Sequence, residues 1–366
     1  MKRNEIAARA RVLRVDTSQY RRVIAVSDTH GNGYLLKRLL GELSFSKEDA
    51  LFLLGDFIER GRDSLATVRL AMELCRAGNA FALQGNCDTL WDDLAAGVYG
   101  VDLNAYVDWR RNSLIADMCA EQGMDRSRIS PGELRAALDD RYGAIFAWLR
   151  GLPHIIDTRE AVFVHAGIDA GSLTEQSAER CLRREAFLEE ELRFEKTVVC
   201  GHIPTCNYFH MTGNRYSFLP LTLRDKNMIA IDGGNAVKKY GQLNALVLEG
   251  GRISFVYVDD LPEAVVRGDQ AGSLFPAAVA WNHREVEFVE ERGENTLCRV
   301  LFTGKLLEIP KNKLYEVEGK LCSDDYTDYM PPLRTEDRVK LLEIGEKRSL
   351  IKANGIVGWA DNRILT

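Results

Sequence analysis

The sequence predicts an α/β fold with a small all-β region at its C-terminal end. Over the first 260 residues, short β-branched or aliphatic runs alternate with longer segments of helical periodicity, which is typical of parallel strands joined by helical crossovers. From about residue 270 the pattern changes to short alternating segments between turn residues. We therefore expect a large α/β domain over residues 1–262 and a small, β-barrel-like domain over residues 270–366.

Strand and helix patterns alternate at the start of the α/β domain. The first helix is predicted over residues 33–43, where four leucines recur with the spacing of one helix face. A second helix is predicted over 65–77. Aliphatic runs predict buried strands at 23–26, 50–54 and 80–83. This order implies parallel strands with helices between them.

Residues 89–152 interrupt this pattern. They contain Trp91, Trp109 and Trp148 in helical surroundings, and Ser130-Pro131-Gly132-Glu133 is typical of a helix start. We interpret the segment as a helical insertion that covers one side of a functional site.

The strand pattern resumes after the insertion with further aliphatic runs. Each run is short and bounded by polar or turn residues, as buried strands are. These strands are predicted at 161–164, 197–200, 228–231, 243–248 and 253–258.

The C-terminal region carries a weak internal repeat of about 50 residues. Two strand pairs end alike, one in Leu307-Glu308-Ile309-Pro310 and one in Ile356-Val357-Gly358-Trp359. The pattern resembles two tandem Src-homology-3-like units over 270–317 and 318–366. Such a region binds a peptide or protein partner, covers a sheet edge or dimerises. Trp359 is interpreted as a core aromatic residue, with a ligand platform as the alternative.

Composition restricts the class of protein. The net charge of −6 argues against a dedicated nucleic-acid binder. Eight scattered cysteines without a CxxC pair indicate reduced thiols in a cytoplasmic protein and argue against a structural zinc knuckle. No apolar run is long enough to span a membrane. The N-terminal residues 1–15 do not form a secretion signal, although a transit-like amphipathic arm is an alternative.

Five short motifs lie at the ends of predicted strands. Each combines an apolar run with glycine and with a carboxylate, amide or imidazole side chain. In chain order they are Val26-Ser27-Asp28-Thr29-His30-Gly31-Asn32, Leu54-Gly55-Asp56-Phe57-Ile58-Glu59-Arg60-Gly61, Gln84-Gly85-Asn86-Cys87-Asp88, Phe163-Val164-His165-Ala166-Gly167 and Val199-Cys200-Gly201-His202.

The position of these motifs predicts a metal site. Polar residues that follow parallel strands meet at the carboxyl edge of the sheet, where α/β proteins bind ligands. Carboxylate, imidazole and amide ligands suit divalent manganese, iron or zinc. Taken singly, the aspartates would cap helices and the histidines would fill the core. Taken together they favour a metal site, because three of the six histidines of the chain fall in these motifs.

The five motifs resemble the signature of calcineurin-like metallophosphatases, in particular the phosphoprotein phosphatase branch, whose second motif reads GDxxDRG. The resemblance spans about residues 20–250. Ile231-Asp232-Gly233-Gly234 with Tyr240-Gly241-Gln242-Leu243, and Leu182-Arg183-Arg184-Glu185-Ala186-Phe187, resemble further segments of bacterial and diadenosine-tetraphosphatase-like members. The family implies a sandwich of mixed sheets flanked by helices.

The resemblance also implies roles for individual residues. Two divalent metals are expected, with manganese preferred and iron, zinc or nickel as alternatives. A water or hydroxide that bridges the metals would be the nucleophile. Arg60 and Arg184 would bind phosphate oxygens. The metal ligands would be Asp28 and His30 at the first metal, Asp56 at both, and Asn86, His165 and His202 at the second.

Two positions depart from the family pattern. Cys87 occupies the place of a histidine that donates a proton to the leaving oxygen, and Glu59 occupies the place of the aspartate that pairs with this histidine. A protonated thiol is a weaker donor than imidazolium. We therefore hypothesise that Cys87 lowers activity on alkyl phosphomonoesters relative to activated esters or diesters.

Three functions remain open at this point. The first is a serine/threonine-phosphatase-like phosphomonoesterase that acts on a phosphoprotein or a small phosphoester. The second is a phosphodiesterase or dinucleoside-polyphosphate hydrolase. The third, of another class, is a metal-binding scaffold of low activity that recruits partners through its C-terminal region. His210, eight residues after His202, is a further candidate for the site.

Overall fold

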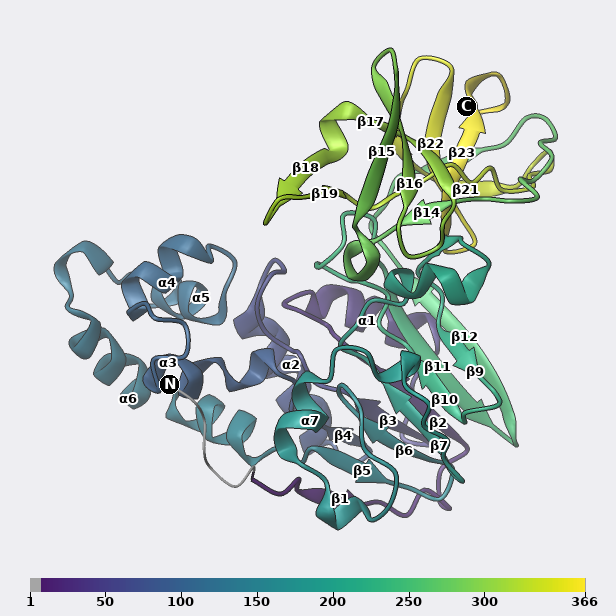
Figure 1. Ribbon diagram of the computed structural model, residues 1–366. Coiled ribbons are helices and arrows are strands. Elements are labelled where there is room, and N and C mark those ends of the chain that lie inside the picture. Colours follow the sequence, from purple (N-terminus) through teal and green to yellow (C-terminus); the bar gives the residue numbers. More distant parts are fainter. Residues whose placement is uncertain (1–7, 366) are drawn as a thin grey trace. The chain divides into compact units, whose positions relative to one another are not determined.

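Two mixed β-sheets carry the predicted motifs in a computed structural model that describes residues 8–365. One sheet has six strands and the other has five (Figure 1). The six strands are, in spatial order, β1 (Val12–Arg14), β5 (Ile155–Asp157), β6 (Ala161–Val164), β7 (Thr197–Cys200), β10 (Met228–Ala230) and β9 (Leu221–Leu223). The five are β12 (Arg252–Val258), β11 (Leu243–Glu249), β2 (Arg22–Val26), β3 (Asp49–Leu53) and β4 (Ala80–Ala82).

Each sheet contains a run of three parallel strands. In one sheet β2, β3 and β4 run parallel, and in the other β6, β7 and β10 do so. Antiparallel strands complete both sheets, among them the hairpin of β11 and β12. The mixed sheets agree with the predicted fold class, and the parallel runs carry the motifs at their carboxyl ends.

The two sheets pack face to face through apolar side chains. Phe52 of β3 stacks on Phe163 of β6, with ring centroids 4.6 Å apart and an interplanar angle of 9°. Alternate residues of β2, including Val23 and Ala25, face the same core. Fully burying side chains of this size contributes about 1.5–3 kcal/mol each, so this layer stabilises the framework of the site.

Helices cover the outer face of the five-stranded sheet. The helix α1 (Gly33–Glu42) buries its four leucines there, as its periodicity predicts, and α2 (Ser64–Arg76) lies beside it. The Asp63 carboxylate accepts a hydrogen bond from the backbone N–H of Ala66 and caps α2. A short helix, α7 (Ala178–Arg183), follows the fourth motif.

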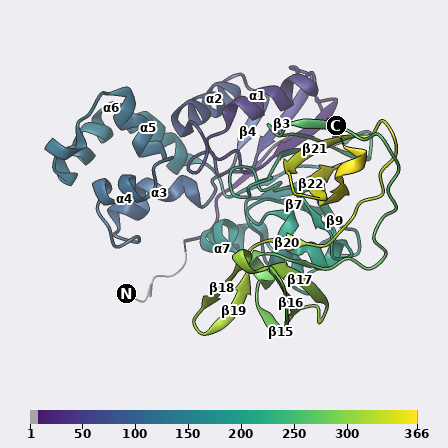
Figure 2. The same cartoon turned by 90° about the horizontal axis from the view of Figure 1, so that it is seen from above.

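The insertion is helical and gathers next to α2 (Figure 2). Its longest helix begins with a complete capping box between Ser130 and Glu133. Trp91 stacks on Phe146, with centroids 4.2 Å apart, and so joins the first insertion helix to the last. The helices are α3 (Leu90–Ala95), α4 (Leu103–Trp109), α5 (Leu114–Glu121) and α6 (Pro131–Gly151).

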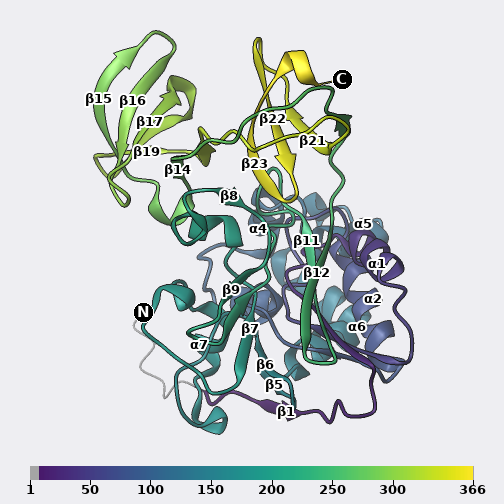
Figure 3. The ribbon, with the colours of Figure 1, turned by 90° about the vertical axis from the view of Figure 1, so that its right-hand side faces the viewer.

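A second structural unit is all β apart from short 3-10 turns. It comprises residues 204–219 and the described residues from 260 onward, and Figure 3 shows its strands in two groups. One group is the sheet of β13 (Glu263–Val265), β21 (Arg338–Glu343), β22 (Arg348–Ala353), β23 (Ile356–Asp361) and β8 (Tyr216–Ser217). The other contains β15 (Val286–Arg292), β16 (Asn295–Val300) and β17 (Leu306–Pro310), the pair β18 (Leu314–Val317) and β19 (Lys320–Ser323), and the pair β14 (Ala278–Val279) and β20 (Tyr326–Thr327).

The boundaries of this unit differ from the predicted ones. Residues 204–219 belong to it because β8 pairs with β23, a long-range contact that leaves no local signal. Each strand group has its own small apolar core, and the core of the β21–β23 group includes Ala264. Additional all-β sheets are therefore present, while their likeness to Src-homology-3 domains stays a prediction. The Trp359 indole N–H donates to the carbonyl of Thr327 at 2.8 Å.

The N-terminal segment and the lengths of the helices bear on the predictions about targeting and membrane insertion. The interpretation of residues 1–15 rests partly on residues 1–7, which lie outside the described residues. Within the described chain, no helix combines the length and apolar character needed to cross a bilayer.

Candidate metal centre

The six predicted metal ligands all belong to the first structural unit and follow its strands. Asp28 and His30 follow β2, and Asp56 follows β3. The remaining three follow β4, β6 and β7 in the same way. Parallel register brings these strand ends together, because Val26 is opposite Leu53 in the ladder between β2 and β3. The three ligands that follow β4, β6 and β7 are, in this order, Asn86, His165 and His202.

Asp28 and His202 meet across the two sheets. The backbone N–H of His202 donates to Asp28 Oδ2 at 3.0 Å. A Cβ at Gly201 would lie 2.2 Å from the same oxygen, so only glycine permits this approach. The loops after β2 and β7 are thus in direct contact at the site.

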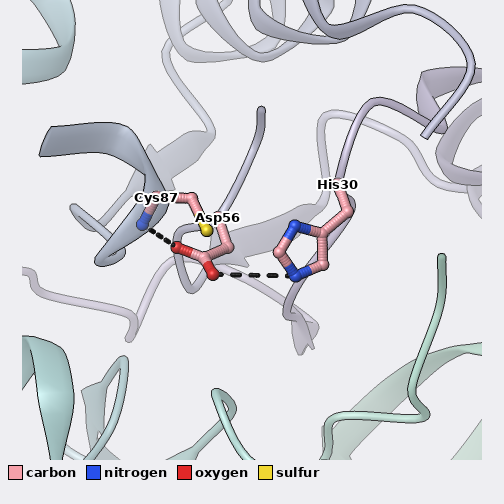
Figure 4. A group of neighbouring side chains, drawn as sticks. All are labelled: His30, Asp56 and Cys87. Carbon is pink, nitrogen blue, oxygen red and sulfur yellow. Dashed lines mark hydrogen bonds and ion pairs between the residues drawn. The ribbon is translucent and has the colours of Figure 1, made fainter. Parts of the chain in front are cut away.

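Asp56 lies between imidazoles from both sides. Its Oδ2 is 3.6 Å from His30 Nε2, and its Oδ1 is 3.5 Å from His165 Nε2. The backbone N–H of Cys87 donates to Asp56 Oδ1 at 2.8 Å, and Figure 4 shows His30, Asp56 and Cys87 converging. A carboxylate in this position has the geometry to serve two metal ions at once.

Backbone carbonyls orient two of the imidazoles. His30 Nδ1 lies 3.2 Å from the carbonyl oxygen of Ile58, and His165 Nδ1 lies 2.8 Å from that of Leu54. A carbonyl oxygen only accepts, so Nδ1 carries the proton in each ring. Nε2 then presents its lone pair to the site, as metal-binding histidines usually do.

The backbone is strained at the same residues. Asp28, His30, Asp56 and His202 have positive φ angles of 54°, 41°, 53° and 70°. Residues other than glycine rarely adopt this region, and each such residue costs about 1–3 kcal/mol. The fold keeps this strain at the one place where the predicted ligands meet.

Burial and neighbouring charge shift the pKa values of the ligands. Burial raises the pKa of Asp28, and the nearby carboxylates of Asp232 and Asp56 add to the effect. Burial lowers the pKa of His30 to about 4 and of His202 to about 3. Both imidazoles are therefore neutral at pH 7, which is the form that binds metals.

The residues present fit divalent metals. Asp28 Oδ1 is buried and has no hydrogen-bond partner among the described residues. Ligand atoms of Asp28, Asp56 and His165 all lie within 4.8 Å of one another, as do those of His30, Asp56 and Cys87. Buried carboxylates without hydrogen bonds are costly, and a bound cation would compensate for them. Mixed oxygen and nitrogen donors suit manganese, iron or zinc.

Asp232 is a site residue for which sequence analysis assigned no role. It follows β10, is 1% exposed, and its Oδ2 lacks a hydrogen-bond partner among the described residues. In the ladder between β10 and β7, Ala230 is opposite Cys200, so Asp232 comes level with His202. The available signal was an aspartate directly after an apolar strand, the pattern that also identified Asp28 and Asp56.

Asp88 holds the second and third motifs together. Its carboxylate accepts hydrogen bonds from the backbone N–H groups of Gly85, Asp56 and Phe57 at 2.8, 2.9 and 3.0 Å. Burial nevertheless raises its pKa to about 7, and the charge of Asp56 acts in the same direction. Asp88 therefore fixes the backbone on which Asp56 sits.

Arg60 and Cys87 lie near the ligands. The positive charge of Arg60 helps to lower the pKa of His30, after the larger effect of burial. Burial raises the pKa of the Cys87 thiol well above its usual range, and the charge of Asp56 raises it further. Cys87 is thus a protonated thiol at neutral pH.

Glu59 points toward the insertion. Its Oε2 accepts a hydrogen bond from the Tyr106 hydroxyl at 2.7 Å, and its Oε1 accepts one from the backbone N–H of Leu114 at 3.0 Å. Burial raises the pKa of Glu59 to about 7. Each carboxylate oxygen of Glu59 therefore accepts a hydrogen bond from the insertion, one from α4 and one from the start of α5.

Arg184 is engaged by carboxylates. It donates to both oxygens of Glu190, and its Nη1 lies 3.0 Å from Asp169 Oδ1. Arg183, which was not predicted as a site residue, contacts the third motif instead. Its Nη2 donates to the carbonyl of Asn86 in that motif at 3.4 Å, and to Thr89 Oγ1 and Asp93 Oδ2 just after it at 2.7 Å each. The sequence offers no signal that distinguishes the two neighbouring arginines.

The remaining histidines have other surroundings. His154 Nδ1 accepts a hydrogen bond from the backbone N–H of Arg11 at 2.9 Å, and His154 directly precedes Ile155, which pairs with Val164 of the fourth motif. His210 belongs to the second structural unit, where its ring centroid lies 5.2 Å from that of His283 and 4.9 Å from that of Phe302.

Comparison with known families decides the classification. The model of the calcineurin-like phosphoesterase family matches residues 21–234, which is more than half of the chain. The chain belongs to the calcineurin-like phosphoesterase family. The five motifs and Asp232 fall within the matched region. Members of this family use divalent metals, and membership supports the prediction that the chain is a hydrolytic enzyme.

Curated relatives match parts of this chain. One, from Shewanella sp. (strain MR-7), is 37% identical over 98 residues, and another, from Xanthomonas euvesicatoria, is 29% identical over 174 residues. Both are named symmetrical bis(5'-nucleosyl)-tetraphosphatase. The matches cover 24% and 47% of this chain, and they span 36% and 45% of the relatives' own lengths.

One similar solved structure is that of a cold-active protein-tyrosine phosphatase from a psychrophilic Shewanella species. The similarity has a TM-score of 0.41 at 17% sequence identity. It covers 68% of this chain and 82% of that one.

Proposed function

We propose that this chain is a divalent-metal-dependent hydrolase that cleaves phosphoanhydride bonds of a dinucleoside polyphosphate. The observation that carries the proposal is the pair of changes at Cys87 and Glu59. Cys87 is a protonated thiol beside Asp56, and the Glu59 carboxylate is bonded to the insertion. An imidazole–carboxylate pair, the strong proton donor of the family, is therefore missing at this position.

The leaving group explains why this matters. An alkoxide that leaves from a serine or threonine phosphate requires a proton, and general acid catalysis contributes about 10²–10⁴-fold to such steps. A nucleoside phosphate that leaves from a P–O–P bridge has a pKa of about 6 and departs as an anion at neutral pH. A site with a weak donor therefore favours anhydrides over alkyl esters.

Two metals would be held by Asp28, His30 and Asp56 on one side and by Asp56, Asn86, His165 and His202 on the other. Bound there, divalent cations activate water and neutralise phosphate charge. Manganese is the preferred ion in this proposal. Iron, zinc and nickel are the alternatives, because the same donor set suits them.

The protein groups bind and orient the substrate. Arg60 presents a planar guanidinium next to the ligands and would hold the non-bridging oxygens of the phosphoryl group that is transferred. Overall hydrolysis adds one water across the P–O bond. The attacked phosphorus keeps the hydroxyl oxygen, the bridging oxygen leaves with the other nucleotide, and one proton is released to solvent.

The relatives support the same substrate class. Two relatives that match part of this chain are named symmetrical bis(5'-nucleosyl)-tetraphosphatase. Symmetrical cleavage of a dinucleoside tetraphosphate by this chain would give two nucleoside diphosphates.

A phosphomonoesterase of the serine/threonine phosphatase type is the second candidate. The GD-x-x-E-R-G sequence around Arg60 favours it, since this arginine-bearing motif is the one that resembles the phosphoprotein phosphatase branch. A metal-binding scaffold that recruits proteins through the second unit is the candidate of another class.

The test compares substrates on the purified, manganese-loaded protein. Diadenosine tetraphosphate, a phosphoserine peptide, nitrophenyl phosphate and bis-nitrophenyl phosphate are assayed with and without chelator, and nucleotide products are separated by chromatography. We expect kcat/KM for the tetraphosphate to exceed that for the phosphopeptide by about 10²-fold or more, with ADP as the product. Preference for the phosphopeptide would establish the second candidate, and absence of turnover on all four would favour the scaffold.

A further inference from the structure

Hydrogen bonds at Glu59 and Arg60 bind the Arg60 loop to the helical insertion, including a long one in which Asn112 Nδ2 donates to the carbonyl of Arg60 at 3.4 Å. The Tyr106 hydroxyl and the Leu114 N–H donate to the two oxygens of Glu59, at 2.7 and 3.0 Å. The backbone N–H of Arg60 donates to the carbonyl of Asn112 at 2.9 Å. The donors and the acceptor come from α4, the start of α5 and the segment between them.

This loop adopts a conformation that needs external support. Glu59 and Arg60 have φ angles of 74° and 73°, so two successive residues with side chains lie in the left-handed region. Each costs about 1–3 kcal/mol and persists only where surrounding contacts hold it. Within the loop, the Glu59 N–H donates to Ser64 Oγ at 2.9 Å. The bonds to the insertion restrain Glu59 and Arg60, while the next residues are bonded to the loop after β2: the Arg62 N–H donates to Asn32 Oδ1 at 3.2 Å and the Asp63 N–H to the carbonyl of Gly31 at 2.8 Å.

The insertion also holds the far end of the loop. Asp117 of α5 accepts hydrogen bonds from the backbone N–H groups of Ser64 and Leu65, at 2.6 and 3.2 Å. These are the first residues of α2. Residues 59–65 are therefore attached to the insertion at both ends, and Arg60 lies between the attachments.

Glu59 and Arg60 differ sharply in their exposure to solvent. Glu59 is 3% exposed and Tyr106 is 2% exposed, whereas Arg60 is exposed. The charge of Arg60 nevertheless acts on His30 and Cys87. Glu59 is thus the buried anchor of the loop, and the exposed guanidinium of Arg60 acts electrostatically on His30 and Cys87.

We propose that Glu59 is a positioning residue: its carboxylate joins the Arg60 loop to Tyr106 and Leu114 of the insertion and so fixes the phosphate-binding guanidinium. The inference deepens the proposed function and rests on it. It assigns the insertion a role in binding the phosphoryl group, and it removes Glu59 from the proton transfer that the family resemblance implied.

Two substitutions of Glu59 separate positioning from proton transfer. Glu59→Gln keeps an oxygen for the Leu114 N–H and an amide that donates to the Tyr106 oxygen, so it preserves the link without a titratable group. Glu59→Ala removes the link. We expect Glu59→Gln to retain kcat and KM within about threefold, and Glu59→Ala to raise KM about tenfold or more with a smaller change in kcat, as loss of about one hydrogen bond to a charged group would.

Tyr106→Phe removes one donor from the link and leaves the fold of α4 intact. We expect KM to rise in the native background and to change no further in an Arg60→Ala background, because the tyrosine acts through the arginine. Tyr142→Phe is the matched control. The Tyr142 hydroxyl also donates to a glutamate of the insertion, Glu121, at 2.7 Å, but does not touch the loop.

Binding of inorganic phosphate to the manganese-loaded variants, measured by calorimetry, gives a readout that does not require turnover. We expect weaker binding by Glu59→Ala and Tyr106→Phe, and wild-type binding by Glu59→Gln and Tyr142→Phe. A fall of about 10²-fold in kcat for Glu59→Gln would overturn the proposal in favour of proton transfer. Additive losses in the Tyr106→Phe/Arg60→Ala double variant would also contradict it. Lack of turnover with this phosphate-binding pattern intact would count against the proposed function alone.

Discussion

The metal-ligand edge and the Arg60 loop are neighbours, yet they are built in different ways. The ligands at the edge follow strands, two of them β2 and the others β3, β4, β6 and β7, and the register of two parallel runs brings the strand ends together. The Arg60 loop has positive φ angles like the ligand positions, but its Glu59 is bonded to the insertion and not to a strand. The sandwich positions the candidate metal site, whereas the insertion positions the candidate phosphate-binding residue.

This difference separates two properties of the enzyme, the binding of metal ions and the binding of a phosphoryl group. Changes in the insertion can alter how a phosphoryl group is held without moving any ligand atom. Changes at the strand ends would remove metal binding whatever the insertion does. Substitutions in the two regions should therefore produce distinct kinetic signatures, and the following experiments test this.

The largest effect is expected from Asp56→Asn. Asp56 lies between His30 and His165, at 3.6 and 3.5 Å from their Nε2 atoms, and an amide cannot supply two anionic oxygens. We expect kcat to fall by about 10³-fold and bound metal per chain to decrease. Turnover and elemental analysis of the purified variant measure both. Full metal content in this variant would show that Asp56 is not a shared ligand and would break the comparison.

A smaller effect is expected from Cys87→His. A histidine at this position restores the imidazole of the family but not its carboxylate partner, since Glu59 is held by Tyr106 and Leu114. We expect turnover of a phosphoserine peptide to rise less than about tenfold, below the 10²–10⁴-fold of a complete general acid. Turnover of nitrophenyl phosphate, which needs no proton donor, serves as the control. A rise of about 10²-fold on the peptide would show that Glu59 can still act as the partner.

The smallest effect on activity is expected from Asp49→Asn, a buried aspartate of the sandwich that lies outside both regions. Arg22 donates to both oxygens of Asp49 at 2.8 Å, and this pairing lowers the pKa of Asp49 to about 2. A carboxylate with a depressed pKa stabilises the fold above its unfolded pKa of 3.8, and this stabilisation, about 2 kcal/mol, is lost as the pH falls through 2.

We therefore expect Asp49→Asn to destabilise the protein by about 3 kcal/mol at pH 7 with unchanged kcat and metal content. The stability difference from the wild type should narrow between about pH 5 and pH 2. Urea unfolding across this range measures it. A difference that stays constant with pH would mean that the Arg22 pair does not shift the titration of Asp49.

The strand ends were predictable from sequence because their signal is local. An apolar run followed by aspartate, histidine or a glycine-flanked amide marks both the strand and the residue that leaves it, as at Asp28, Asp56 and His165. Leucine periodicity likewise identified α1, and Ser130 with Glu133 marked the start of α6. Each of these features depends on a few consecutive residues.

The features that were not predictable depend on distant contacts. The direction of the Glu59 carboxylate is decided by Tyr106 and Leu114, about fifty residues away. The choice of Arg183 over Arg184 as the contact to the third motif depends on side-chain packing, which neighbouring identical residues do not reveal. Residues 204–219 belong to the second unit through contacts with residues far along the chain, including the pairing of β8 with β23 and the hydrogen bond from the Tyr216 hydroxyl to Asp325.

The buried carboxylates of the metal centre make the stability of the fold depend on the concentration of free divalent cations. Asp28, Asp56 and Asp232 are each at most 3% exposed, and their mutual repulsion opposes folding unless cations offset it. Any cation that binds only the native chain raises its stability in proportion to the logarithm of the free ion concentration. The supply of the divalent metal would then govern how long each molecule survives proteolysis as well as how fast it turns over, so scarcity of the metal would lower the abundance of the protein.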